Sequence, residues 1–310
     1  ELDLSSVESI KVINNTSLSI TGEINNKKTN QIKGQQYFFD FVFGKEATYN
    51  VNTEFKGGVG EYLYKNVLGS KTTTITQSQL DAIEELILDS EEDNISYTSF
   101  PNMDKFTNLK TFEVEGSTAT SLNLSNNTKL EKVYIKKCSK LTSISVYKQT
   151  LKSYYLEYSP ITSLDISDYP NLEYFGTKNN SSLTKISINN CPKLDHLVSY
   201  NNFALQSISG TNSFANVSIC ELYNNSNLVF VPLTSMPNLN YLNFHGNPLS
   251  TLDISKCSKL RYLEVNVEVG TLNLSNNPAL LHAVYDEDGL VSVVGGYDVY
   301  MVGSGEYKDV

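Results

Sequence analysis

The sequence predicts a mainly β solenoid, a tube of stacked coils, and two observations support this prediction. A phrase of the form apolar-x-x-apolar-x-apolar begins nine times between Leu109 and Leu280, at steps of 20 to 23 residues, and an irregular tenth copy begins at Ile83. A second, simpler apolar phrase recurs between these starts, as in SLNLSNN at 121–127. Self-similarity at such a period is typical of solenoids, because one repeat buries its apolar face only against the next.

Residues 1–75 lack the repeat and are predicted to form a small antiparallel β domain. Stretches rich in β-branched and aromatic residues, separated by polar turns, predict strands over 8–13, 17–24, 36–43 and 47–54. An immunoglobulin-like sandwich is one candidate topology, although the chain has no Trp and no Cys-Trp-Cys signature. Segment 70–75 (SKTTTI) is expected to be the linker to the solenoid.

Residues 76–289 are predicted to form the solenoid, which begins with a helical cap. Thr76 can cap a short helix that extends through residue 82. A cap is physically required, because the first coil would otherwise expose an apolar edge to water. The lead residues of the nine regular repeats are Leu109, Leu130, Leu151, Leu172, Leu194, Val217, Leu239, Leu260 and Leu280.

This repeat resembles the leucine-rich repeat family, whose pattern is L-x-x-L-x-L-x-x-N/C-x-L. The resemblance implies about ten coils in a right-handed solenoid, with a parallel sheet on the concave face. It also implies a ladder of buried side chains that hydrogen-bond the turning backbone near the eighth residue after each lead. The ladder residues are Cys138, Asn180, Asn202, Asn225 and Asn247.

Residues 290–310 are predicted to form a β cap. The stretch LVSVVGGYDVYMV at 290–302 resembles two short strands around Gly295-Gly296, which is a signal for a two-residue hairpin. Such a hairpin would close the last coil.

Charge and hydropathy restrict the partner and the location. The net charge of −10 argues against nucleic acid, because binding phosphates needs clustered Lys and Arg. No apolar run approaches the ~20 residues that span a bilayer. The chain starts at Glu1 without Met, so we leave open a removed signal segment or a lipid anchor upstream. These features, with the repeat type, favour an exported bacterial protein that is extracellular or on the cell surface.

The four cysteines are expected to be reduced. Cys191 and Cys257 are three coils apart, hence about 14 Å, and Cys138 and Cys220 are four coils apart, hence about 19 Å. A disulfide needs Cα atoms within ~7 Å. No cysteine spacing suggests zinc, so we expect neither a metal nor a cofactor.

The outward positions of the first half-turn, two, four and six residues after each lead, form the candidate binding surface. All three histidines and seven of the twenty tyrosines fall on these positions. Tyrosine offers a large contact area at low entropic cost and keeps a hydroxyl for hydrogen bonds. The predicted ligand-binding residues, clustered in the C-terminal half, are Tyr174, His196, Tyr200, Tyr223, Tyr241, His245, Tyr262 and His282.

Other interpretations of these residues stay open. Tyrosines on neighbouring strands stabilise a sheet by cross-strand packing, roughly 0.2–1 kcal/mol per pair, without any ligand. The three histidines are two or more coils apart, about 10 Å or more, which is too far to share a metal ion. The stretch from Asp89 to Asn94 begins like a calcium loop but lacks its glycine and its final glutamate.

The sequence therefore predicts a non-enzymatic recognition module that binds a protein or a glycan on the concave face. The nearest alternative is a structural spacer that presents the N-terminal domain, and a carbohydrate-processing accessory role is a more distant one. No phosphate loop, nucleophile elbow or pair of catalytic carboxylates is present, so no catalytic residue is predicted.

Overall fold

The structure is a computed structural model of the whole chain, and it describes residues 23–24, 27–28, 46–248, 252–265, 271–280, 282–284, 292–294 and 300–302. The predicted strands over 8–13 and 36–43, and all but residues 23–24 of the one over 17–24, lie outside these residues. Within this part of the N-terminal region, β1 (Glu23–Ile24) pairs antiparallel with β2 (Lys27–Lys28).

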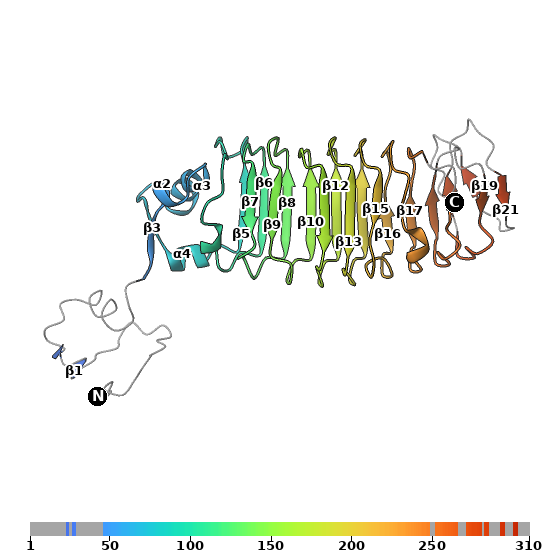
Figure 1. Cartoon of the computed structure of the whole chain (residues 1–310). Coiled ribbons are helices and arrows are strands. Elements are labelled where there is room, and N and C mark those ends of the chain that lie inside the picture. Colours follow the sequence, from blue (N-terminus) through green and yellow to red (C-terminus); the bar gives the residue numbers. More distant parts are fainter. Residues whose placement is uncertain are drawn as a thin grey trace.

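Residues 46–82 form a compact cap on the first coil (Figure 1). The strand expected over 47–54 is shorter: β3 (Thr48–Asn50) ends where Asn50 accepts a hydrogen bond from the Asn52 N–H and caps α2 (Val51–Glu54). The expected linker contains β4 (Thr74–Thr76), which pairs antiparallel with β3. Between them lie the helix α3 (Val59–Tyr62) and the π-helix η2 (Leu63–Val67).

The predicted capping helix is confirmed as α4 (Gln77–Asp81). Thr76 Oγ1 accepts from the Gln79 N–H, and Gln79 Oε1 accepts from the Thr76 N–H, which completes a capping box. The apolar residues of this region, including Val51, Phe55 and Leu80, belong to the same hydrophobic cluster as the first coils. The domain boundary at residue 75 stays a prediction, but the described part before it packs directly on the solenoid.

The predicted solenoid is confirmed: in the described residues an eleven-stranded parallel sheet carries one strand from each coil. All nine lead residues are buried, and the strands pair in the register that the repeat implies. The fold is thus a leucine-rich repeat solenoid. In chain order the strands are β5 (Glu85–Asp89), β6 (Thr111–Glu115), β8 (Lys132–Lys136), β10 (Ser153–Glu157), β12 (Tyr174–Lys178), β14 (His196–Tyr200), β16 (Ile219–Glu221), β17 (Tyr241–Asn243), β18 (Tyr262–Glu264), β20 (His282–Val284) and β22 (Tyr300–Val302).

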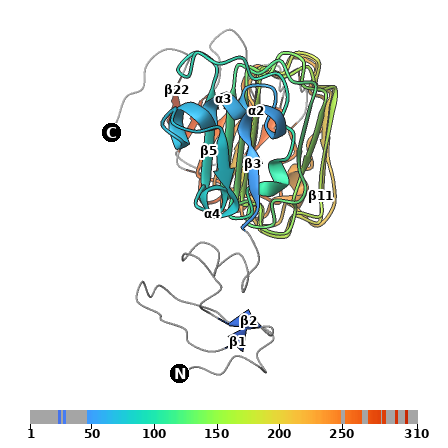
Figure 2. The ribbon, with the colours of Figure 1, turned by 90° about the vertical axis from the view of Figure 1, so that its left-hand side faces the viewer.

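The second apolar phrase forms the opposite wall of the tube, in shorter parallel sheets. Short 3-10 helices, η3 (Met103–Lys105) and η4 (Leu233–Ser235), replace strand in two coils. Figure 2 looks along the tube, with β5 and β22 on one wall and β11 on the other. The outer strands are β7 (Ser121–Leu124), β9 (Ser143–Val146), β11 (Ser163–Ser167), β13 (Lys185–Asn189), β15 (Ser207–Ser209), β19 (Thr271–Asn273) and β21 (Ser292–Val294).

The C-terminal hairpin is a wrong prediction. The two strands expected to pair with each other instead continue the coils: β21 pairs parallel with β19, and β22 pairs parallel with β20. Each strand thereby extends an existing sheet edge, and the inner and outer walls both gain a strand. Gly295-Gly296 lies outside the described residues.

The predicted asparagine ladder is confirmed and runs along the tube. Asn180 Oδ1 accepts from the Ser159 N–H (2.9 Å), Asn202 Oδ1 from the Asn180 N–H (2.8 Å), and Asn225 Oδ1 from the Asn202 N–H (3.0 Å). Asn247 continues the ladder, because its Oδ1 accepts from the Asn225 N–H at 3.2 Å. All four asparagines are at most 2% exposed, so each satisfies backbone groups that water does not reach.

In the coils where the structure describes it, the residue seven positions after the lead is left-handed, and there the chain turns away from the inner sheet. Asparagine and glycine tolerate this conformation best. Most coils comply, but one places a tyrosine there, Tyr158, with φ of 49°. The residues with positive φ at this position are Gly116, Lys137, Tyr158, Asn179, Asn201, Asn224 and Gly246.

Candidate functional site

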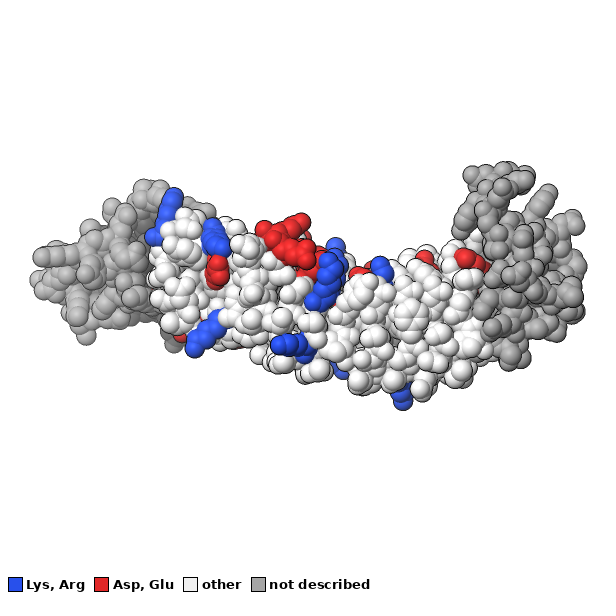
Figure 3. Space-filling model, turned by 90° about the horizontal axis from the view of Figure 1, so that it is seen from above, with Lys and Arg blue, Asp and Glu red and all other residues white. Residues whose placement is uncertain are grey.

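The inner sheet lies on the concave side of the molecule, where the candidate site was predicted. Seen from above, the tube is bowed, and the wall that holds the eleven-stranded sheet follows the inner side of the bend (Figures 2 and 3). Acidic and basic side chains gather along the middle of this inner side (Figure 3). The half-turn chosen from the sequence is therefore the one that lines the concave face.

The N-terminal half of this face is covered by ion pairs between neighbouring coils. Lys136 Nζ lies 2.6 Å from Glu113 Oε1, and Lys178 Nζ lies 3.4 Å from Glu157 Oε1. Tyr155 donates its hydroxyl to Glu157 Oε2 at 3.1 Å. These charges largely satisfy one another, so this half offers little net charge to a partner.

Six of the eight predicted aromatic residues form three ring pairs between neighbouring coils. The Tyr174 and His196 rings have centroids 6.2 Å apart, and the Tyr241 and Tyr262 rings have the same spacing at an interplanar angle of 40°. Tyr200 and Tyr223 stack closely, with centroids 4.5 Å apart and rings 13° from parallel. The structure therefore brings six of the predicted residues together in pairs, and these pairs have different surroundings.

Two of the pairs owe much of their order to packing within the sheet. Lys178 Nζ lies 5.3 Å from the centroid of the Tyr200 ring, which also stacks on Tyr223. A Cβ at Gly176 would lie 2.8 Å from the Tyr174 hydroxyl oxygen, so this ring lies over the glycine. Burial, followed by the charge on Tyr200, raises the pKa of both Tyr174 and Tyr223 to about 12.

The histidines do not gather. His196 Nδ1 lies 2.8 Å from Asp195 Oδ2, and Ser218 Oγ donates to the other oxygen of that carboxylate at 2.5 Å. His245 lies at the turn after β17, with its N–H bonded to Asn243 Oδ1. His282 begins β20 and pairs in register with Tyr262. In the described part of the chain, no group of three His, Cys, Asp or Glu residues is arranged to hold a metal ion.

The third pair borders a hollow on the concave face. This depression has a volume of about 420 Å³, and Tyr241 and Tyr262 form one side of it. Tyr262 is 44% exposed, the most of the predicted residues whose side chains are described. The lining residues are Ser218, Ile219, Glu221, Asn240, Tyr241 and Tyr262.

Four of these lining residues were not selected from the sequence. Ile219 and Glu221 occupy outward positions of the Val217 repeat, but a choice based on aromatic residues left them out. Ser218 and Asn240 directly follow their lead residues, and the Asn240 N–H donates to the Ser218 carbonyl at 2.8 Å. Including the position after the lead among the outward positions would have found them.

The remaining candidates have structural partners. Asp89 Oδ1 accepts from the N–H groups of Glu91 and Glu92, and Asp93 Oδ2 accepts from the Tyr97 hydroxyl, so these carboxylates hold the turn. The four cysteines are buried and free, and burial raises their pKa values, to about 11 for Cys138 and Cys257. No helix among the described residues has the length and apolar character to cross a membrane.

No protein family model matches the chain, and no curated protein matches it in sequence. Among solved structures, an internalin of Listeria monocytogenes is 16% identical at a TM-score of 0.35, over 80% of this chain and 93% of that one. InlJ of the same organism is 19% identical at a TM-score of 0.38, over 81% of this chain and 62% of that one. InlP of that organism is 17% identical at a TM-score of 0.40, over 78% of this chain and 67% of that one. At such values these similarities carry no argument about a partner or an activity.

Proposed function

We propose that this leucine-rich repeat solenoid is a non-enzymatic recognition module that binds a protein partner on its concave face. The observation that carries the proposal is the hollow beside Tyr241, Tyr262 and Glu221. It lies where three coils present aromatic and carboxylate groups together, and aromatic residues next to a depression are typical of the anchoring points of protein interfaces.

The charge of the hollow favours a basic side chain as its occupant. Glu221 forms no ion pair among the described residues. Glu264 lies nearby and accepts from the Asn243 amide at 2.7 Å. The described positions two, four and six residues after the leads include no Lys or Arg from Ile219 to Glu264, and the exposed Arg261 lies one residue after its lead, in line with Ser218 and Asn240. A lysine or arginine of the partner would meet a carboxylate together with tyrosine rings, which combines a charge-assisted hydrogen bond with cation–π attraction.

A role as a structural spacer has an observation of its own in its favour. The stacking of Tyr200 on Tyr223 and the packing of Tyr174 over Gly176 are contacts that the sheet makes without a ligand. These residues stabilise the scaffold, and we assign recognition to the hollow, whose lining does not include them. We further propose that the module acts outside a bacterial cell or on its surface.

The test compares peptides that differ only in one charge. Fluorescence polarisation would measure the binding of an array of peptides made in pairs. The two peptides of a pair differ only in the central residue, which is arginine in one and its neutral isostere citrulline in the other. We expect arginine peptides to bind more tightly, with an advantage that shrinks as salt rises. Glu221→Gln should remove the arginine advantage, and Tyr262→Ala should weaken binding by about tenfold.

Glu173→Gln is the matched control, because Glu173 is exposed and does not line the hollow. Circular dichroism would show that each variant is folded. If no peptide distinguishes arginine from citrulline, or if Glu173→Gln has the same effect as Glu221→Gln, the hollow is not a site for a basic partner. A neutral glycan that binds and is lost with Tyr262→Ala would support the glycan alternative instead.

A further inference from the structure

The outer wall of the tube is interrupted between β9 and β11. Strands β7 and β9 form one parallel sheet, while β11, β13 and β15 form another, and no strand pairing joins the two among the described residues. Elsewhere in this wall the coils are linked at the start of the strand, as by the Thr142 N–H to the Thr120 carbonyl and the Thr184 N–H to the Thr162 carbonyl. The corresponding link between Thr162 and Thr142 is not formed.

One residue departs from the repeat beside this interruption. The position three residues before each lead is buried in every regular coil except one, where it is Lys148. Lys148 is half-buried, donates from Nζ to the Ser167 carbonyl at 2.8 Å, and its Nζ lies 5.3 Å from the centroid of the Tyr169 ring. The coil that contains Lys148 therefore lacks the buried side chain that the other regular coils have at this position. The space that such a side chain fills in those coils is here left to neighbouring side chains.

A cavity of about 260 Å³ occupies this interruption. Its floor is buried and mostly apolar, with Val146, Ile161 and Leu164 at most 8% exposed. Its rim is exposed and polar, with Ser143 and Ser163 on the two strands that do not pair with each other, and with Asp165 beside them. The cavity is therefore apolar inside and polar at the surface.

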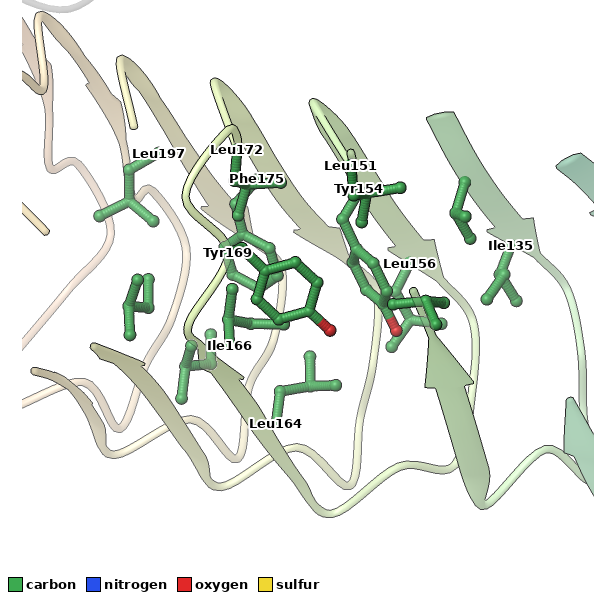
Figure 4. Close-up of a cluster of buried hydrophobic side chains, with 14 of the residues drawn as sticks. Ile135, Leu151, Tyr154, Leu156, Leu164, Ile166, Tyr169, Leu172, Phe175 and Leu197 are labelled. Atoms are coloured by element: carbon green, nitrogen blue, oxygen red, sulfur yellow. The ribbon is translucent and has the colours of Figure 1, made fainter. Parts of the chain in front are cut away.

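Two tyrosine hydroxyls border the cavity without a hydrogen-bond partner in the described part of the chain. Tyr154 and Tyr169 both line it and are only 3% and 5% exposed. Figure 4 shows both rings in the apolar cluster, with their hydroxyl groups turned to the same side. The Tyr154 ring is held by stacking on Phe175, with centroids 6.0 Å apart. The two hydroxyl oxygens are not among the buried polar atoms that lack a partner in the described residues, so both open onto the cavity, where a ligand can reach them.

We propose that this cavity is a binding site for a small amphipathic molecule. Such a molecule has one apolar ring and one acceptor group, which accepts hydrogen bonds from the Tyr154 and Tyr169 hydroxyls. The size fits this class: an apolar protein cavity of about 150 Å³ holds benzene, and ligand pockets for larger molecules start at about 300 Å³. Burial raises the pKa of Tyr169 to about 12 and that of Tyr154 further, so both hydroxyls remain donors at neutral pH.

The test uses two probes of nearly equal shape on the full chain. Acetophenone has the ring and a carbonyl acceptor, whereas ethylbenzene has the ring without an acceptor. Saturation-transfer NMR titrations would measure both. We expect acetophenone to bind at least about tenfold more tightly than ethylbenzene, because only its carbonyl can accept hydrogen bonds from the two hydroxyls that face the cavity.

The double variant Tyr154→Phe/Tyr169→Phe keeps both rings and removes both donors. It should weaken acetophenone by at least about tenfold and leave ethylbenzene within about twofold. Tyr147→Phe, in the preceding coil and outside the lining, is the matched control and should change neither probe. Ile144→Trp, at the wall of the cavity, should exclude both probes; if it fails to fold, the double variant still decides.

Two results would overturn the proposal. If neither probe binds the wild type in saturable fashion, the cavity holds only water. If acetophenone binds equally well to the wild type and to the double variant, the tyrosine hydroxyls do not recognise an acceptor.

Discussion

Replacing Asn225 by alanine is the sharpest test of what holds the coils together. The Asn225 side chain is fully buried and makes three hydrogen bonds. Its Oδ1 accepts from the Asn202 N–H at 3.0 Å, and its Nδ2 donates to the carbonyls of Ser199 (2.7 Å) and Leu222 (2.9 Å). Asn225→Ala leaves a buried N–H without an acceptor and removes one donor from each of two carbonyls.

The magnitude follows from these contacts. An orphaned buried N–H costs about 1–3 kcal/mol, and each lost bond to a carbonyl costs about 0.5–1.5 kcal/mol. We therefore expect the free energy of unfolding to fall by about 2–6 kcal/mol. Asn227→Ala is the matched control, because Asn227 is in the same coil, is exposed, and makes one bond, from Nδ2 to the Phe203 carbonyl at 2.7 Å. It should cost less than about 1 kcal/mol.

Urea unfolding, followed by circular dichroism and by tyrosine fluorescence, measures both variants. Coincidence of the two signals tests for a single transition, which a repeat protein does not always show. If Asn225→Ala costs no more than Asn227→Ala, the ladder does not stabilise the solenoid, and the coils are held by apolar burial alone.

Four further outcomes are expected. Gly176→Ala should lower the free energy of unfolding by about 1–3 kcal/mol, because the new Cβ would lie 2.7 Å from Tyr155 Cδ2 and displace that ring. An unchanged urea midpoint would show that the tyrosine rings over Gly176 move aside without cost. Tyr158→Asn should raise the melting temperature, since φ of 49° strains a tyrosine by about 1–2 kcal/mol and asparagine tolerates it. The native protein should react with a thiol reagent such as DTNB only after denaturant is added, because all four cysteines are buried. The raised pKa values of Tyr174 and Tyr223 contribute stability that is fully present below pH 10 and is lost as pH rises through about 12. The urea midpoint should therefore fall between these pH values, and it should fall less in Tyr223→Phe than in the wild type.

The sequence predicts the coil register well because apolar burial determines it. A shift of one residue would turn every lead residue and the outward tyrosines to the wrong face, so the alternation alone specifies which side chains face the concave side. The ladder was equally predictable, because Asn180, Asn202, Asn225 and Asn247 recur at the one position where a short amide reaches the backbone of the previous coil.

The hollow and the outer cavity were not predictable in the same way. The hollow depends on how the rings of Tyr241 and Tyr262 tilt against each other, which the repeat does not encode. The outer cavity lies where strand pairing stops between β9 and β11, and this break becomes visible only in the assembled wall. The C-terminal hairpin failed because a glycine pair signals a turn but does not determine whether the chain then reverses or continues around the coil.

The ladder has a mechanical consequence. Its bonds join residues 21 to 23 positions apart, so each coil is fastened to its neighbours and to nothing farther along the chain. Tension applied to one end would therefore detach the coils one at a time, each releasing about 70–80 Å of extended chain. A module of this design that holds a partner under load would lengthen in steps and dissipate the force, while the coils still stacked keep their concave face intact.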